Sequence, residues 1–320
     1  MKYSIITPVY NRADCVSRCL DSVIRNLQWN VEFEHIVVDD GSHDNTPQIL
    51  QQYADKYEHI KFIAFPQNRG TNAARNAAIK IASGDFCIIL DSDDYFVDDA
   101  MRKIDAIVSQ NMFKHFCFVA DDMIPYYQSC SLLRGRQQVI ISYEDFLYEH
   151  IAGDFIHVIA TDNLLKYPFS EELRIYEGVF FKRLYRDAKK ILYVNELVTI
   201  RERNRADSVI RTVFRNNKVG LSRGMKSKLL LEEWFANDLL KSEEGRRILD
   251  KTYKVILDCS LMLSDYNKAK EYIYKIKELN ISRIPLRFNL IFALRLGELY
   301  FYLGCLYVFL RYKILKSKVQ

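Results

Sequence analysis

The stretch FCIILDSDDYF, residues 86–96, joins an unbroken apolar run to a cluster of acids. Residues 86–90 have the length and composition of a buried strand, and Asp91, Asp93 and Asp94 follow directly. Strands that are buried on both faces are typical of parallel sheets. Ligands of such sheets bind at the carboxyl ends of the strands. The three carboxylates are therefore predicted to face a ligand.

Strand-like and helical segments alternate on the N-terminal side of this stretch. The strand-like segments are YSIITPVY (3–10), FEHIVVDD (33–40), IKFIAF (60–65) and DFCIIL (85–90). The helical segments are RADCVSRCLDSVIRNL (12–27), residues 46 to about 57, and TNAARNAAIKIAS (71–83). The alternation predicts an α/β fold with a doubly wound, mainly parallel sheet.

The pattern changes in the second half of the chain. Alternation weakens after residue 122, and the sequence becomes helical from about Val213. We therefore expect two domains, residues 1–212 as the α/β domain and residues 213–320 as an α-helical C-terminal region, with the boundary between residues 210 and 220.

The acid cluster also predicts a metal site. Three neighbouring carboxylates repel one another, and burying them as anions requires a cation or hydrogen-bond donors. Mg²⁺ and Mn²⁺ prefer oxygen ligands and commonly take one or two carboxylates together with substrate phosphates. We therefore predict that Asp91, Asp93 and Asp94 hold Mn²⁺ or Mg²⁺. The alternative is that the cluster opens a helix, with Ser92 or Asp93 as the N-cap.

Four motifs, taken in chain order, resemble those of glycosyltransferase family 2, the inverting nucleotide-sugar transferases with the GT-A fold. They are SIITPVYNR (4–12), VVDDGSHDNT (37–46), NRGTNAARNAAI (68–79) and ILDSDD (89–94), the last as the DxD motif. The resemblance covers about residues 1–210. It implies inverting transfer of a sugar from a nucleoside diphosphate, usually a UDP-sugar, to a hydroxyl of a saccharide or lipid-linked saccharide in cell-surface polysaccharide synthesis such as that of capsule.

The resemblance implies donor-binding roles for residues of the first three motifs. Pro8 and Tyr10 would shape the base pocket, Tyr10 by offering a flat stacking face. Asp39 would accept a hydrogen bond from the uracil-type ring, whereas Asp40 is expected to cap the turn that follows. Arg75 would contact the nucleotide or a nearby acid. The alternatives are a core tyrosine at residue 10 and a solvated helix charge at residue 75.

The resemblance also assigns the DxD motif and a late basic segment. Asp91 and Asp93 match the two acids of DxD and would hold the ribose and the metal, with Asp94 sharing the ligation. The segment VTIRERNRADSVIR (198–211) resembles a basic loop that would neutralise the departing diphosphate. Guanidinium groups pair with phosphate in a fork geometry. The candidates in this segment are Arg201, Arg203 and Arg205.

The catalytic base is expected in the segment PFSEELRIYEGVFFKRL, residues 168–184. Family members usually carry Glu-Asp where this sequence has Glu177 followed by Gly178. Glu177 is therefore the expected base that deprotonates the acceptor hydroxyl. Glu171, Glu172 and Asp162 are the alternatives.

The C-terminal tail concentrates the positive charge of the chain. The formal net charge is +5, and the tail from Ile281 onward has seven basic residues against one acid, Glu298. Its longest uncharged run, residues 299–310, is shorter than the roughly 20 residues that span a bilayer. We expect the tail to lie on an anionic membrane surface, with a packed helical hairpin as the alternative, and we expect no nucleic-acid partner.

The cysteines point to a reduced compartment. There are seven, scattered and without a CxxC pair. Cys15 and Cys19 lie four residues apart on an expected helix, where a buried face explains them better than zinc does. With no signal-peptide pattern in MKYSIITPVYNRAD, we expect a cytoplasmic protein, peripheral on the inner face of the membrane if the tail binds there.

Two other classes of protein share part of this pattern. A sugar nucleotidyltransferase also uses acids and a metal on an α/β sheet, but it requires a basic glycine-rich loop after the first strand, where this chain has TPVYNRAD. A non-catalytic family member that binds nucleotide-sugar or serves as a scaffold is the second alternative, because Gly178 replaces the usual Asp.

Overall fold

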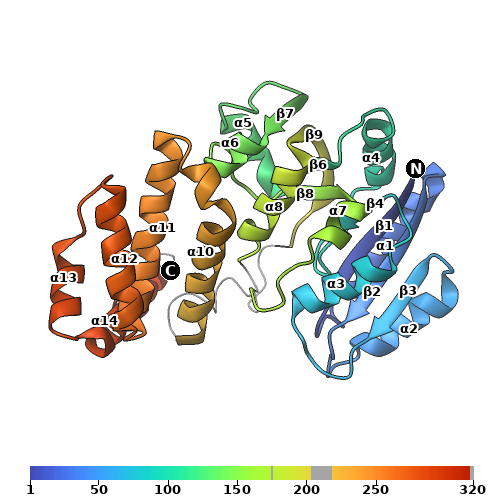
Figure 1. Cartoon of the computed structure of the whole chain (residues 1–320). Helices are drawn as coiled ribbons and strands as arrows, with labels where there is room; N and C mark the ends of the chain where they lie inside the picture. The colour runs from blue at the N-terminus through green and yellow to red at the C-terminus, as the bar shows by residue number, and fades with distance from the viewer. Residues whose placement is uncertain (174–175, 203–217, 318–320) are drawn as a thin grey trace. The chain divides into compact units, whose positions relative to one another are not determined.

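The computed structural model of the chain describes residues 1–173, 176–202 and 218–317 (Figure 1). It divides into two compact units, Met1–Arg205 and Ala206–Gln320. The domain boundary expected at residues 212/213 lies outside the described residues.

The first unit is built on one mixed sheet, which has nine strands among the described residues. The strand order is β3-β2-β1-β4-β8-β6-β9-β5, and β7 pairs with β9. The strands are β1 (Lys2–Val9), β2 (Glu32–Asp39), β3 (Ile60–Ala64), β4 (Phe86–Ile89), β5 (Tyr95–Phe96), β6 (His115–Ala120), β7 (Gln138–Ser142), β8 (Ile156–Ala160) and β9 (Lys190–Ile200).

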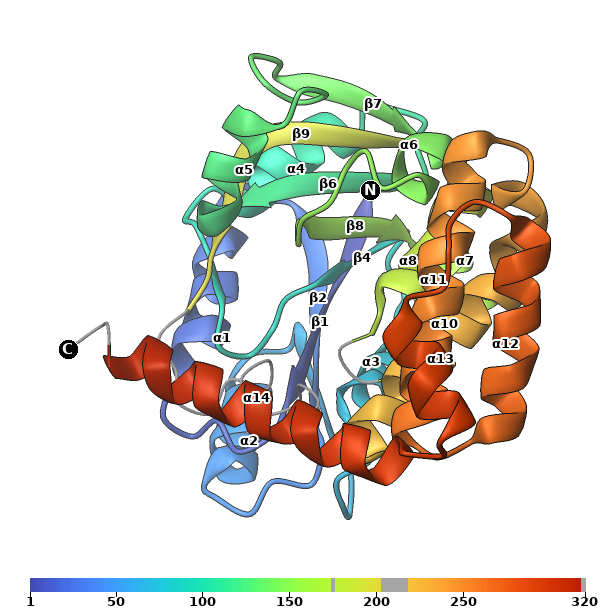
Figure 2. The same ribbon diagram turned by 90° about the vertical axis from the view of Figure 1, so that its left-hand side faces the viewer.

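The strands before residue 90 are all parallel, as the alternation predicts, because β1 pairs in parallel with β2 and β4, and β2 with β3. Strand β8 then runs antiparallel to both β4 and β6. Figure 2 shows β6 between β8 and β9, and β6 runs parallel to β9. The expected α/β, mainly parallel fold is confirmed, with an antiparallel strand inserted at its centre.

Helices cover both faces of this sheet (Figure 1). On β1, Ile5 packs with residues of α1 and α4, whereas Ile6 packs with residues of α3 and α8. Successive residues of a strand point to opposite faces, so an apolar pair in β1 serves two cores. The helical segments are α1 (Val16–Arg25), η1 (Asn26–Trp29), α2 (Thr46–Lys56), α3 (Thr71–Ile81), α4 (Ala100–Val108), η2 (Asp121–Met123), α5 (Ile124–Ser129), α6 (Tyr143–Leu147), α7 (Thr161–Lys166) and α8 (Gly178–Ala188).

A buried glutamate links four strand segments of the parallel half. Glu34 on β2 is 4% exposed, and its Oε1 accepts hydrogen bonds from Ser4 Oγ on β1 and from the backbone N–H of Ser83, just before β4, both at 2.6 Å. Lys61 on β3 places its Nζ 2.5 Å from Oε2. Burial alone would raise the pKa of Glu34, but the Lys61, Ser4 and Ser83 hydrogen bonds lower it to about 2.

The second unit is helical among its described residues, which confirms the expected helical C-terminal region. Helix α11 is the most buried of these helices and packs against α10 and α12. Ser242 caps α11 by accepting the N–H of Gly245, and Asp265 caps α12 by accepting the N–H of Lys268. The helices are α10 (Lys218–Leu239), α11 (Glu243–Met262), α12 (Tyr266–Leu279), α13 (Leu286–Ala293) and α14 (Gly297–Ser317).

The tail is only partly packed. Phe288 of α13 and Phe301 of α14 are buried, and Phe301 packs with Leu221 and Met262. Six leucines at helical spacing are more than half exposed: Leu286, Leu290, Leu294, Leu299, Leu303 and Leu306. Across the described ranges, none of the helices combines the length and the apolar character that crossing a membrane requires.

Replacing Glu34 by Gln is expected to flatten part of the acid response of the first unit. The folded pKa of about 2 lies below the ordinary 4.5, so stability from the ionised carboxylate is complete above pH 4.5 and is lost as pH falls through about 2. The native chain should exceed E34Q by about 2–3 kcal/mol near neutral pH, and the gap should close toward about pH 2. Urea titrations followed by Trp29 fluorescence, in a Trp234→Phe background, measure this gap; a gap that does not change with pH would contradict the role of Glu34.

Candidate functional site

The candidate site is formed where β1, β2 and β4 end together. Asp39, the last residue of β2, pairs with Val9 at the end of β1. Leu90, the residue after β4, donates its N–H to the carbonyl of Ile6 on β1. Asp39 and Asp91 therefore emerge at the same edge of the sheet, as the parallel topology predicts.

The DSDD segment turns rather than opening a helix. The N–H of Asp94 donates to the carbonyl of Asp91 at 3.0 Å, and β5 follows immediately. Helix α4 begins only at Ala100. The alternative in which Ser92 or Asp93 caps a helix is therefore wrong, because a strand separates them from the helix.

Arg75 of α3 joins two acids of the predicted site. Its Nη2 lies 3.0 Å from Asp91 Oδ1, and its Nη1 lies 3.6 Å from Glu177 Oε1. The Arg75 side chain is 14% exposed. Burial would lower its pKa, but the charges of Asp91 and Glu177 raise the pKa of Arg75 above its ordinary value. Arg75 is thus a site cation that contacts nearby acids, rather than a solvated helix charge.

The two acids at the end of β2 have different partners. Asp39 is 2% exposed; its Oδ2 accepts the N–H of Ser42, and its Oδ1 is buried with no hydrogen-bond partner in the described part of the chain. Asp40 accepts the N–H groups of Arg69 at 2.7 Å and Gly70 at 2.8 Å. Asp39 therefore caps the turn that was expected for Asp40, and Asp40 holds the loop that leads into α3.

Gly41 allows this loop to approach the end of β2. Its φ is +73°, and a Cβ there would lie 2.5 Å from the carbonyl carbon of Gln67 and 2.7 Å from the nitrogen of Asn68. Only glycine tolerates both the backbone conformation and the close approach. The same contact fixes where α3 begins and therefore where Arg75 lies.

Asp94 faces Arg201 rather than its two neighbours in the motif. Its Oδ2 lies 3.5 Å from Arg201 Nε, and its Oδ1 accepts the N–H of Glu202. Burial and the charge of Asp91, opposed by Arg201 and reinforced by Asp93, raise the pKa of Asp94 to about 8. Because Arg201 and the Glu202 N–H already engage its carboxylate in a buried position, Asp94 is less available as a third metal ligand than Asp91 and Asp93.

Asp93 completes the DxD pair on the open side of the turn. Its Oδ2 lies 3.9 Å from Arg12 Nη2, and its side chain is 27% exposed. Asp91 is 50% exposed. Asp91, Asp93 and Asp94 thus turn toward three different arginines, and the predicted three-carboxylate metal site is not assembled. Asp91 and Asp93 alone still match the one or two carboxylates that Mg²⁺ or Mn²⁺ takes beside phosphate.

The other expected residues take various positions. Pro8 is buried on β1, opposite Val38 of β2, and Tyr10 is half-buried just after the strand, with its ring edge-on to His43. Arg201 is 11% exposed and already contacts acids, so it is not an open phosphate ligand in this structure. Arg203 and Arg205 lie outside the described residues.

The other acids considered as the catalytic base are Asp162, Glu171 and Glu172, and their positions differ from that of Glu177. Asp162 follows β8 at the end where Ala160 pairs with Phe86, which is the amino end of β4. It is therefore on the edge of the sheet opposite to Asp91. Glu171 is about half exposed and lies 3.5 Å from Arg69 Nη2, and Glu172 is exposed.

The structure adds an acid that sequence reasoning missed. Asp154 Oδ2 lies 3.2 Å from Arg201 Nη1, and the Asp154 side chain is 83% exposed. Its charge also acts on Arg75, which places it by the same site. Asp154 precedes β8, an antiparallel strand whose amino end lies at the carboxyl edge of β4. The sequence could have placed Asp154 at this edge only if the direction of β8 had been known, because an acid that precedes a strand reaches the carboxyl edge of a parallel sheet only when that strand is antiparallel.

Residues 4–140 match the family model described as glycosyl transferase family 2. A poly(ribitol-phosphate) beta-glucosyltransferase of Bacillus spizizenii is 45% identical over 104 residues, 32% of this chain and 16% of that protein. Glycosyltransferase GlyG of Streptococcus pneumoniae is 26% identical over 231 residues, 66% of this chain and 73% of that protein. The chain thus spans only a small part of the length of the first of these relatives.

Solved structures show the same fold. The structure of S. aureus TarS 1–349 in complex with UDP-GlcNAc matches with a TM-score of 0.63 at 18% identity, covering 94% of this chain and 87% of that one. The sheet and its flanking helices therefore have the GT-A fold, as expected. The family match covers residues 4–140 of the chain, and the fold agrees with it.

Replacing Arg75 by Met is expected to destabilise the first unit. The substitution keeps an unbranched apolar side chain but leaves Asp91 and Glu177 without their shared cation, at a cost of about 1–3 kcal/mol. Arg69→Met is the matched control, because Arg69 is half exposed and its pair with Glu171 should contribute less than about 1 kcal/mol. Equal losses in the two variants, in urea titrations of Trp29 fluorescence, would contradict the bridging role of Arg75.

Proposed function

We propose that the chain is an inverting glycosyltransferase that moves a hexose or N-acetylhexosamine from a UDP-sugar to a hydroxyl of a saccharide or polyol-phosphate polymer at the cell surface. The observation that carries the proposal is the position of Arg75 between Asp91, the first acid of DxD, and Glu177, the candidate base. Donor-binding and proton-accepting groups thereby share one site. The family match and the names of the relatives support the same class of reaction.

The uridine part of the donor would bind at the ends of β1 and β2. The buried, unpartnered Oδ1 of Asp39 suits an acceptor for a ring N–H, since leaving it unpaired is costly. Tyr10 offers an aromatic face beside it. Asp91 would accept the ribose hydroxyl. Asp154, exposed and held by Arg201, is placed to accept a hydroxyl of the transferred sugar.

Asp91 and Asp93 would hold Mn²⁺ or Mg²⁺ together with the donor diphosphate. The ion would supply positive charge to the departing diphosphate, which develops negative charge in the transition state. The fit rests on two partly exposed carboxylates in one turn, with the nearby Arg12 ready to exchange its long contact with Asp93 for the phosphates.

Glu177 would receive the proton of the acceptor hydroxyl. As the acceptor oxygen bonds to the anomeric carbon, the bond from that carbon to the phosphate oxygen breaks and UDP leaves. Inversion requires the base and the leaving group on opposite faces of the sugar. Arg75 would orient the Glu177 carboxylate before the acceptor arrives.

The test is release of UDP from a panel of UDP-sugars, with and without Mn²⁺, in the presence of saccharide and ribitol-phosphate acceptors. Glu177→Gln should lower kcat about 10²–10⁴-fold because it removes the base, and Asp93→Asn should abolish the response to Mn²⁺. Glu171→Gln is the matched control and should retain near-native rates. Native-like turnover by E177Q would sink the assignment of the base.

A substitution at Gly178 distinguishes a catalytic chain from one that binds nucleotide-sugar without transferring it. A Cβ at residue 178 would meet no atom within 4 Å among the described residues, so Gly178→Asp fits sterically. If the native chain turns over and G178D is no faster, Glu177 is sufficient as the base. Turnover that appears only in G178D would favour a native chain that binds nucleotide-sugar without transferring it.

We also propose that α13 and α14 associate with an anionic membrane surface, on the cytoplasmic side. The six exposed leucines accompany exposed Arg283, Arg287 and Arg295, which suits an interfacial helix. The full chain should sediment with vesicles that contain phosphatidylglycerol and much less with phosphatidylcholine vesicles. Leu299→Glu/Leu303→Glu should lose this binding, and Leu240→Glu, just after α10, should not. Equal binding by both variants would contradict the proposal.

A further inference from the structure

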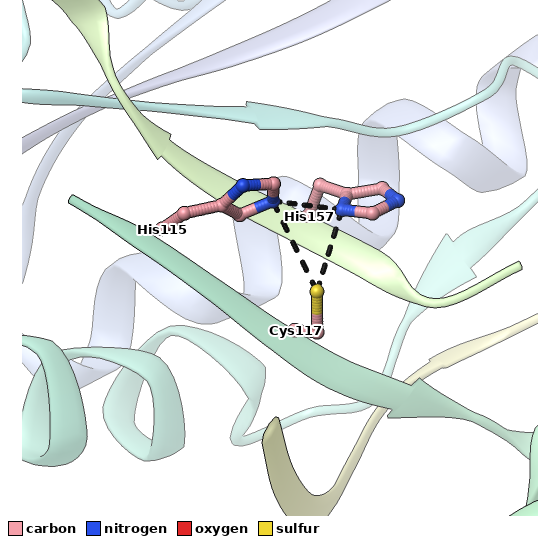
Figure 3. A group of neighbouring side chains, drawn as sticks. All are labelled: His115, Cys117 and His157. Carbon is pink, nitrogen blue, oxygen red and sulfur yellow. Dashed lines mark hydrogen bonds between the residues drawn. The ribbon is translucent and has the colours of Figure 1, made fainter. Parts of the chain in front are cut away.

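Three metal-ligating side chains, none of them among the acids of the DxD motif, converge on one face of the central sheet. His115 and Cys117 are alternate residues of β6, so both side chains project to the same face. Strand β8 runs antiparallel to β6 and places His157 directly opposite Cys117. Figure 3 shows the two imidazole rings and the thiol pointing toward one another. Strand pairing, rather than a linear motif, brings this set together.

The distances among the three ligand atoms match a tetrahedral site. His115 Nε2 lies 2.9 Å from His157 Nδ1, and Cys117 Sγ lies 3.4 Å from His157 Nδ1 and 3.9 Å from His115 Nε2. Zinc bond lengths of about 2.0–2.1 Å to nitrogen and about 2.3 Å to sulfur imply N···N distances of about 3.3 Å and N···S distances of about 3.6 Å. Small side-chain adjustments would therefore accommodate the ion.

The site is buried in an aromatic environment. His115 and Cys117 are fully buried, His157 is half-buried, and the His157 ring stacks on Phe181 of α8 with centroids 4.2 Å apart. Burial lowers the pKa of both histidines, that of His157 to about 3. The same burial raises the pKa of the Cys117 thiol, so the case for a metal rests on the geometry of the three side chains.

The protein groups alone leave the cluster incompletely satisfied. The contact between His115 Nε2 and His157 Nδ1 uses one ring proton, and His115 Nδ1 is buried with no partner that the described ranges supply. Tyr185 Oη lies 3.5 Å from Cys117 Sγ and 2.6 Å from Tyr193 Oη. The Tyr185 hydroxyl can donate a hydrogen bond to the Cys117 thiolate, as outer groups do at zinc sites. Alternatively, its oxygen can serve as the fourth ligand of the ion.

We propose that His115, Cys117 and His157 bind a structural Zn²⁺ between β6, β8 and helix α8. Two imidazoles and one thiolate select zinc over the Mg²⁺ or Mn²⁺ that the carboxylates of the DxD motif would take. On binding, the Cys117 thiol releases its proton and the thiolate coordinates the ion; neither the protein nor the ion changes oxidation state. The ion would cross-link β6 to the antiparallel strand β8, where Phe181 and Tyr185 of α8 pack against the ligands.

The first measurement is metal content and spectroscopy of the untagged full chain. Protein from zinc-supplemented cells should contain about one zinc per chain by mass spectrometry, and refolding with Co²⁺ should give a thiolate-to-cobalt charge-transfer band in the near ultraviolet. The carboxylates of the other site cannot produce that band. A native chain with neither zinc nor the band would overturn the proposal and leave a hydrogen-bonded cluster only.

Variants test whether the ion is held by these residues. Cys117→Ser and, independently, His157→Gln should lose the zinc and lower the Tm, whereas Cys87→Ser, at another buried strand cysteine, should keep both zinc and band. Asp93→Asn should also keep them. Zinc retained in full by both C117S and H157Q, or lost in C87S, would place the ion elsewhere and refute the assignment; if either variant fails to fold, the native measurement and the other variant decide.

Discussion

The two-pronged contact of Arg75 with Asp91 and Glu177 is the interaction on which the candidate site depends. Asp91 comes from the end of β4 and Glu177 from the residue before α8, almost ninety positions later, and one guanidinium holds both. A lysine could not replace it, because a single ammonium lacks the fork that reaches two acids in different directions. The position of Arg75 depends in turn on Asp40 and Gly41, which fix the loop before α3.

Pairing of acids with arginines extends across the site. Asp91, Asp93 and Asp94 repel one another within one turn, and the fold separates them by giving each a different arginine: Arg75, Arg12 and Arg201. The pairs differ in burial, so the acids are not equivalent. Asp94 is buried, whereas Asp91 and Asp93 remain partly exposed. A diphosphate and its cation would enter on that open side, where the 3.9 Å contact between Arg12 and Asp93 is long enough to be exchanged.

Much of this could be predicted from the sequence, and the failures share one physical cause. Residues 1–96 alternate strand and helix so regularly that the parallel sheet and the common edge of Asp39 and Asp91 follow from local patterns, and four sequence motifs in the same stretch carry the family resemblance. After residue 122 the pattern ends, because β8 inserts antiparallel between β4 and β6. Strand direction is a tertiary property, and it is what brings Asp154 to the site, removes Asp162 from it and sets His157 opposite Cys117. The partner of Asp94, Arg201, likewise lies just after β9, more than a hundred residues along the chain.

The central claim is that these strand ends form one nucleotide-sugar site organised around Arg75. A crystal structure of the chain with a UDP-sugar and Mn²⁺ tests it most directly. The account predicts the uracil ring against Asp39, the ion on Asp91 and Asp93 with the diphosphate, and the anomeric carbon within reach of the Glu177 carboxylate. A nucleotide bound away from the ends of β1, β2 and β4, or a Glu177 that turns away from the sugar while another acid approaches it, would contradict the account.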